Sequence, residues 1–145
     1  MALIQYFGNT GSIKQISRSK FKTTLLSLAK NHQKVIDSIS YIFVSDPEIL
    51  EINKKHLNHD YYTDIITFDL TDTDQSVEAE IYISIDTVST NANLFQTEFQ
   101  TEILRVMYHG VLHLLGYADK STNEKKQMRA MEDHCLNLYL ETNKQ

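Results

Sequence analysis

The chain has 145 residues, of which 41% are hydrophobic and 23% charged, with 4 Gly, 1 Pro and a formal net charge of -5. A chain of this length buries roughly 70% of the surface that its unfolded form exposes, so we expect residues 1–145 to fold as one domain without disulfides or a structural metal. The negative charge excludes the broad basic surface that drives non-specific nucleic-acid binding. Binding to RNA would need a local basic patch or a partner.

No segment has the composition of an export signal or a transmembrane helix. The first residues lack a basic stretch followed by a sustained apolar run, and no window approaches the roughly 18 apolar residues of a membrane span. The single cysteine, Cys135, cannot form an intramolecular disulfide and lies in a segment with helical apolar spacing, which favours a small core residue. We therefore expect a cytoplasmic protein that does not bind membranes.

Apolar spacing and turn residues predict the elements in chain order. Four runs rich in β-branched and aromatic residues are typical of strands: residues 4–7, 39–44, 65–70 and 80–85. Four segments have the spacing of helices: residues 20–31, 47–57, 87–115, in two pieces, and 123–139. A polar loop joins the last two strands, which is compatible with a hairpin. The order β-α-β-α-β-β-α-α predicts an α+β fold with helices packed on one small mixed sheet of about four strands.

The most informative segment is HGVLHLLGYAD, which runs from His109 to Asp119. His109 and His113 are four residues apart, so on a helix their imidazoles project from the same face and can reach one metal ion. Two such histidines alone are more often ordinary, partly buried residues. Gly116, however, permits the left-handed turn that ends a helix, and a chain that reverses there can return Asp119 as a third ligand.

Three protein ligands leave one coordination position open for water, which is the pattern of catalytic rather than structural zinc sites. Zinc lowers the pKa of a bound water to roughly 7, so hydroxide becomes available near neutral pH. The same skeleton occurs in metzincin proteases, but these need a glutamate directly after the first histidine as general base. Gly110 stands there in this chain. The segment therefore predicts a zincin-like metal helix of a hydrolase that is not a metzincin protease.

The segment HGVLHLLGYADK resembles the signature of the YbeY family, His-Gly-x-Leu-His-Leu-x-Gly-Tyr-Asp-His, at nearly every position from His109 to Tyr117. A second family segment, Leu-Asn-x-x-Tyr-Arg-x-x-Asp-x-x-Thr-Asp-Val-Leu-Ser-Phe, resembles residues 52–68. The resemblance implies a small sheet with helices around it. It also implies a metal-dependent, single-strand-specific endoribonuclease that matures the 3′ end of 16S rRNA, takes part in ribosome quality control and binds the ribosome or a ribosomal protein.

Two positions depart from the family pattern. The family's third ligand is a histidine, whereas this chain has Asp119, preceded by Ala118 where the family has an aspartate. A carboxylate is a competent zinc ligand, but its charge suits harder ions, so we expect one zinc ion per chain, or Mn²⁺ or another divalent transition metal instead. Leu57 stands where the family has an arginine that contacts the phosphate backbone, and leucine cannot make that contact.

Other polar residues are weaker candidates. Arg105 lies one helical turn before His109 and could replace the family arginine, although a solvated helix residue is the more frequent case. Further candidates for this phosphate contact are Lys54, Lys55 and Lys120. Asp64 and Glu102 could serve as general base or bind an imidazole N–H, so the catalytic residues stay open. The remaining histidines, His32, His56, His59 and His134, lack the spacing of ligands.

Two other classes of function stay open from the sequence. Leu57 and the acidic charge are compatible with a ribosome-assembly binding factor whose metal is structural. The ligand set His109, His113 and Asp119 is also formally that of a 2-His-1-carboxylate iron oxygenase. The oligomeric state and the nucleophile of the reaction are not predicted.

Overall fold

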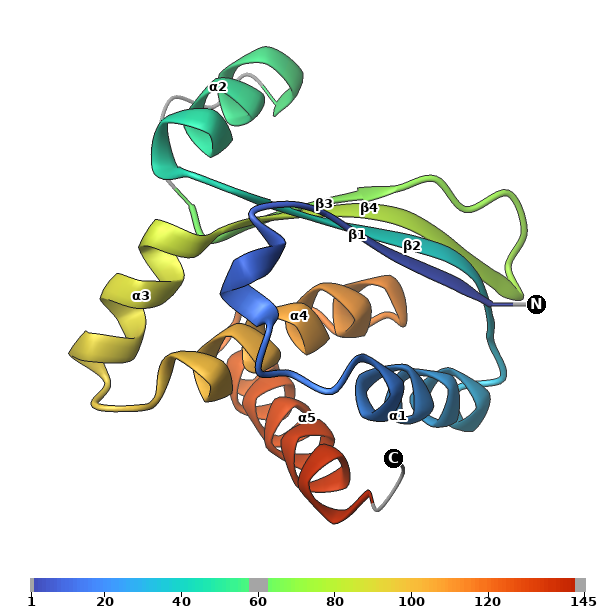
Figure 1. The fold of residues 1–145 in the computed structure, drawn as a ribbon. Coiled ribbons are helices and arrows are strands. Elements are labelled where there is room, and N and C mark those ends of the chain that lie inside the picture. Colours follow the sequence, from blue (N-terminus) through green and yellow to red (C-terminus); the bar gives the residue numbers. More distant parts are fainter. Residues whose placement is uncertain (1, 58–62, 143–145) are drawn as a thin grey trace.

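The structure, a computed structural model, describes residues 2–57 and 63–142. A mixed sheet crosses the middle of the molecule and has helices on both faces (Figure 1). Its strands are β1 (Leu3–Gly8), β2 (Val35–Val44), β3 (Ile65–Asp69) and β4 (Ser76–Ser84). The helices are the 3₁₀ turn η1 (Thr10–Ile13), α1 (Arg18–Asn31), α2 (Asp46–Leu57), α3 (Ile85–Leu94), α4 (Phe99–Leu114) and α5 (Thr122–Glu141).

The strands lie in the order β1-β2-β4-β3. β1, β2 and β4 are parallel, and β3 pairs antiparallel with β4, with Ile65 opposite Ile83 and Asp69 opposite Ala79. The predicted hairpin is this β3–β4 pair. The α+β class, the mixed sheet of four strands and the order of elements are confirmed, and the helical segment 87–115 is divided into α3 and α4 as predicted.

The lengths that the sequence predicted for the two central strands, β2 and β4, are too short. β2 begins at Val35 rather than at residue 39, and β4 begins at Ser76 rather than at residue 80. The additional residues pair with each other across the sheet, with a register shift between Ile36 and Ser38. Hydrogen bonding between neighbouring strands therefore extends the sheet past Asp37, Ser38 and Glu78, which have little strand propensity of their own. The short turn η1 was not predicted.

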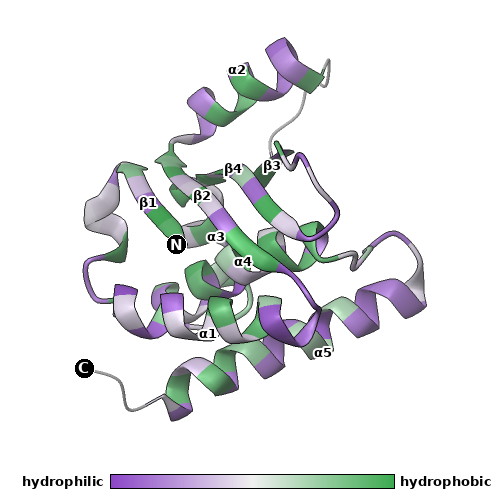
Figure 2. Cartoon of the chain, turned by 90° about the vertical axis from the view of Figure 1, so that its right-hand side faces the viewer, coloured by the Kyte–Doolittle hydropathy of each residue, from purple (hydrophilic) through white to green (hydrophobic). Residues whose placement is uncertain are grey.

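Side chains from the sheet form two separate cores. On one face, Tyr41, Phe43 and Ile81 are buried against α1, α4 and α5. On the other face, Val44 and Ile66 pack with Ile49 of α2 in a much smaller cluster. Figures 1 and 2 show this arrangement from two sides: α2 stands alone above the sheet, whereas α1, α4 and α5 lie below it.

Cys135 lies in the larger core, as the sequence predicted, and is 1% exposed. Burial raises the pKa of its thiol to about 12, and the nearby Glu132 carboxylate acts in the same direction. The thiolate is therefore strongly disfavoured near neutral pH, and Cys135 acts as a small apolar residue.

Helix α4 packs directly against the sheet at Gly110. A Cβ atom at this position would lie 3.0 Å from Cδ1 of Ile65 and 3.1 Å from Cδ1 of Ile81, on β3 and β4. The absence of a side chain thus sets the distance between helix and sheet. A side chain at position 110 would also enter the core, so the position that carries the general base in metzincins is directed at the sheet here.

Gly110→Leu is expected to lower the free energy of unfolding by about 1–3 kcal/mol, because the new side chain must displace Ile65 and Ile81 in a packed core. Urea denaturation measures this difference. Ala130→Leu places the same side chain at an exposed position of α5 and should change stability by less than about 0.5 kcal/mol. Equal stability of Gly110→Leu and the wild type would contradict the close packing of α4.

Candidate metal centre

Helix α4 presents His109 and His113 one turn apart. Their rings are edge to face, with centroids 4.6 Å apart and an interplanar angle of 82°. Ile103 and Met107 of the same helix are fully buried in the core, which fixes the rotation of α4 about its axis. The two histidines therefore lie beside the buried face, where the helix meets β3 and the end of α2.

A tight turn after α4 brings Asp119 back to these histidines. Gly116 has φ +107°, in the left-handed region predicted from the sequence, and its N–H donates to the carbonyl oxygen of His113 at 3.1 Å. The N–H of Tyr117 donates to the carbonyl oxygen of Leu112 at 3.0 Å. This pair of bonds ends the helix and reverses the chain. The loop is held at its far end by the capping box that begins α5.

His32 anchors the same loop from α1. Its Nε2 is 2.8 Å from the hydroxyl of Tyr117, and its Nδ1 is 2.9 Å from the carbonyl oxygen of Leu28. Since the carbonyl can only accept, Nδ1 of the neutral ring donates to Leu28, and Nε2 accepts from the Tyr117 hydroxyl. His32 is thus a structural residue, which agrees with its exclusion from the predicted ligands.

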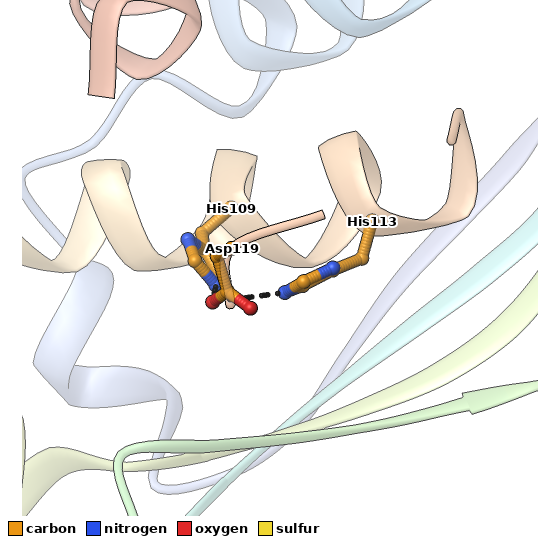
Figure 3. Close-up of side chains that lie close together, drawn as sticks. All are labelled: His109, His113 and Asp119. Atoms are coloured by element: carbon orange, nitrogen blue, oxygen red, sulfur yellow. Dashed lines mark ion pairs between the residues drawn. The ribbon is translucent and has the colours of Figure 1, made fainter. Parts of the chain in front are cut away.

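The three predicted ligands meet at one point beside α4 (Figure 3). Nε2 of His109 and Nε2 of His113 are each 3.3 Å from Oδ2 of Asp119, and the candidate ligand atoms all lie within 4.8 Å of one another. Ligands of tetrahedral zinc, at bond lengths near 2.0–2.1 Å, are separated by roughly 3.3 Å. The donor set and its spacing therefore fit a divalent metal ion. Within residues 2–57 and 63–142, this is the one group of its kind.

Glu132 of α5 orients one of these imidazoles, a role that was not predicted. Its Oε2 is 2.6 Å from Nδ1 of His109, and its Oε1 accepts from Arg105 at 3.0 Å. With the Nδ1 proton held by a carboxylate, the lone pair of Nε2 is available to a metal. Burial lowers the pKa of His109, but the hydrogen bond to Glu132 and the charges of Glu132, Asp119 and Asp64 outweigh it, so the pKa is raised.

Glu132 could have been found in the sequence. It is 5% exposed and lies on the apolar stripe of α5, four residues after Met128 and three before Cys135. A carboxylate at a position with buried spacing requires a partner, because an unpaired buried charge is costly. The sequence alone does not show which residue that partner is, since His109 lies on another helix.

Arg105 is not a solvated helix residue, because two carboxylates of α5 hold its guanidinium. Its guanidinium binds Glu132 and, at 2.7 Å, Oδ1 of Asp133, and only 13% of its side chain is exposed. The expectation of a solvated residue is wrong, because it did not take the acidic pair on α5 into account, whereas the phosphate contact stays a prediction. Leu57 lines the hollow beside the candidate ligands. The hollow therefore has a leucine side chain where the family pattern has a guanidinium.

Asp64 and Glu102 lie near the ligands but bind neither imidazole through a hydrogen bond within the described part of the chain. Asp64 lines the same hollow as all three ligands, and burial raises its pKa, although the neighbouring His109 acts in the opposite direction. Burial also raises the pKa of Glu102, against the attraction of Arg105 and Arg129. Asp64 thus stays a candidate base, and the imidazole partner is Glu132.

The other predicted residues lie outside the ligand group. His56 packs edge-on against Phe68, with centroids 5.7 Å apart, and the side chain of His134 is exposed. His59 lies outside the described residues. Three lysines proposed for phosphate binding, Lys54, Lys55 and Lys120, do not line the hollows next to the ligands in the part of the chain that the structure describes.

The ligands open onto a hollow of about 400 Å³ between α2, β3 and α4. The family model described as Endoribonuclease YbeY matches residues 5–140, which include every ligand. The chain belongs to the YbeY family. The resemblance of the two sequence segments is thereby confirmed.

Relatives and a solved structure agree with membership of the YbeY family. A protein named Endoribonuclease YbeY from Cytophaga hutchinsonii is 47% identical over 121 residues, 83% of this chain and 85% of that protein. One of the same name from Porphyromonas gingivalis is 39% identical over 142 residues, 98% of this chain and 93% of that protein. A solution structure from Thermotoga maritima has a TM-score of 0.66 and 28% identity, covering 94% of this chain and 88% of that one.

Glu132→Gln is expected to lower the affinity for Zn²⁺ about tenfold, because the neutral amide orients and polarises His109 less strongly than the carboxylate. Competition with a chromophoric chelator measures the affinity. Asp133→Asn removes the exposed partner of Arg105 and should leave it near the wild-type value. An unchanged affinity in Glu132→Gln would contradict the role of this carboxylate.

Proposed function

We propose that this chain is a metal-dependent, single-strand-specific endoribonuclease that matures ribosomal RNA at the 3′ end of 16S rRNA, with residues 1–145 acting as one domain. The observation that carries the proposal is the convergence of His109, His113 and Asp119 beside an open hollow in a member of the YbeY family. The relatives bear the name endoribonuclease, so the binding-factor and oxygenase alternatives are not favoured.

In this proposal His109, His113 and Asp119 hold the metal ion. A bound divalent metal would supply a water molecule of lowered pKa as nucleophile. Glu132 keeps the proton of His109 on Nδ1, so that Nε2 stays a ligand. Asp64 lines the hollow beside the ligands, and its raised pKa makes its carboxylate a stronger base than an ordinary aspartate.

The proposed metal is one zinc ion per chain. Asp119 adds a negative charge where the family pattern has a neutral histidine, and this charge also suits Mn²⁺ or another divalent transition metal. Two imidazole nitrogens remain in the set, and these favour a transition metal over Mg²⁺ or Ca²⁺.

The proposed partners are single-stranded rRNA and the ribosome or a ribosomal protein, in the cytoplasm. A net charge of -5 repels a polyanion, so a basic docking partner would add to the affinity for RNA. None of the helices in the described ranges, 2–57 and 63–142, has the length and apolar character that crossing a bilayer requires.

Metal content tests the ligand set. Plasma mass spectrometry of the purified wild type should find about one transition metal per chain, and both His109→Ala and Asp119→Ala should lose it, because a site with two remaining ligands binds weakly. His134→Ala, which removes an exposed histidine of α5, should retain the metal. Metal retained in both ligand variants, or absent from the wild type after reconstitution, would refute the site.

Cleavage of RNA tests the activity. His113→Ala is expected to slow cleavage of a single-stranded RNA at least about a hundredfold, because several kcal/mol of transition-state stabilisation are lost with the metal. The His134→Ala control should cleave at the wild-type rate, and an RNA duplex should resist both proteins. Cleavage by His113→Ala at the wild-type rate would rule out the proposed mechanism.

A further inference from the structure

The metal ligands also open toward α5, on the side away from Leu57. A second hollow, of about 310 Å³, is lined by His109 and Asp119 together with Lys125 and Arg129. His109, Lys125 and Arg129 also line a third hollow, of about 610 Å³, which reaches Phe95 at the end of α3. These shared side chains make the two hollows neighbours, and together they form a depression beside α5.

Positive charge beside the ligands is confined to this depression. Among the described residues, the hollow next to Leu57 has no lysine or arginine in its lining. The hollows along α5 have three cationic residues, of which Arg105 is held by Glu132 and Asp133. The other two, Lys125 and Arg129, are exposed and four residues apart, so they lie on the same face of α5.

No other described side chain binds Lys125 or Arg129 through a hydrogen bond or an ion pair of its own. Glu102 attracts Arg129, but it is buried, with 5% exposure. Glu132 is likewise buried and is occupied by His109 and Arg105. The two cations can therefore receive an anion from solvent without displacing a partner.

An exposed aromatic ring stands at the far end of the depression. Phe95, the residue directly after α3, is 52% exposed and lines the third hollow. Proteins that bind single strands combine a positively charged groove with aromatic side chains on which unpaired bases stack. Bases in a duplex have their faces covered by neighbours, so an accessible ring of this kind selects single strands.

We propose that single-stranded RNA crosses the metal centre and continues along α5, with phosphates on Lys125 and Arg129 and an unpaired base stacked on Phe95. These three residues form the α5 tract. The inference rests on the proposed function, whose substrate path it specifies. The proposal assigns phosphate binding in this chain to Lys125 and Arg129 of α5. The family arginine, which Leu57 replaces, would lie on α2.

The salt dependence of RNA binding tests the two cations. The double variant Lys125→Gln/Arg129→Gln should bind a short single-stranded RNA about tenfold more weakly near 0.1 M salt, and the slope of log affinity against log salt should fall in magnitude by roughly 1.4, for two phosphate contacts. Fluorescence anisotropy of the full-length, metal-loaded protein measures both quantities. The RNA carries phosphorothioate linkages that slow hydrolysis, and a denaturing gel after each titration checks that it is intact.

A matched control separates local contacts from net charge. Lys30→Gln/Lys126→Gln removes the same two charges from exposed positions outside the hollows and should retain wild-type affinity and slope within about twofold. Equal losses in the two double variants would overturn the proposal, because they would show a general charge effect. Unchanged binding by Lys125→Gln/Arg129→Gln would also overturn it.

The stacking contact has its own test. Phe95→Leu keeps an apolar side chain but removes the ring, and should weaken binding about fivefold or more, whereas Phe95→Tyr should bind like the wild type. Equal binding by the three proteins would remove Phe95 from the tract.

Binding and cleavage are read separately, so the two proposals can fail separately. A wild-type protein that cleaves RNA while both α5-tract variants bind normally would overturn this inference and leave the nuclease function intact. A wild-type protein that binds through the α5 tract but does not cleave any single strand would support this inference and refute the nuclease function.

Discussion

The candidate centre depends on the buried carboxylate of Glu132, which binds His109 on one side and Arg105 on the other. Removing one partner of a buried ion pair costs about 3–5 kcal/mol, because the remaining charge is left uncompensated. The packing of α5 against α4 is therefore coupled to the orientation of His109, a candidate metal ligand. A change that shifts α5 would alter the orientation of His109 through this carboxylate.

The other two ligands are held by backbone geometry instead of charge. Gly110 brings α4 against the sheet, and Gly116 reverses the chain so that Asp119 faces the histidines. His32 fastens the returning loop to α1 through Tyr117. The three candidate ligands lie within residues 109–119. The sheet and α1, which are distant in sequence, hold this segment in its place in the fold.

The sequence predicted what local rules determine. The four-residue spacing of His109 and His113 and the turn at Gly116 specify one face and one reversal, and the order of elements follows from apolar periodicity. The sequence did not predict the strand pairing that makes β2 begin at Val35 and β4 at Ser76. It also did not predict the ion pair of Arg105. Both depend on a partner elsewhere in the chain: a neighbouring strand in the first case, and Glu132 in the second.

The two departures from the family pattern act on the site in the same direction. Asp119 places a negative charge where the pattern has a neutral imidazole, and Leu57 removes a positive charge, so the site is more negative by about two charges than the pattern implies. A divalent metal attracts a phosphodiester less strongly when one of its ligands is negatively charged, because that ligand offsets part of the positive charge of the metal. Lys125 and Arg129 supply two positive charges at the opposite rim of the same centre. The substrate contacts of this chain can thus differ from the family pattern while the fold and the position of the metal ligands are retained.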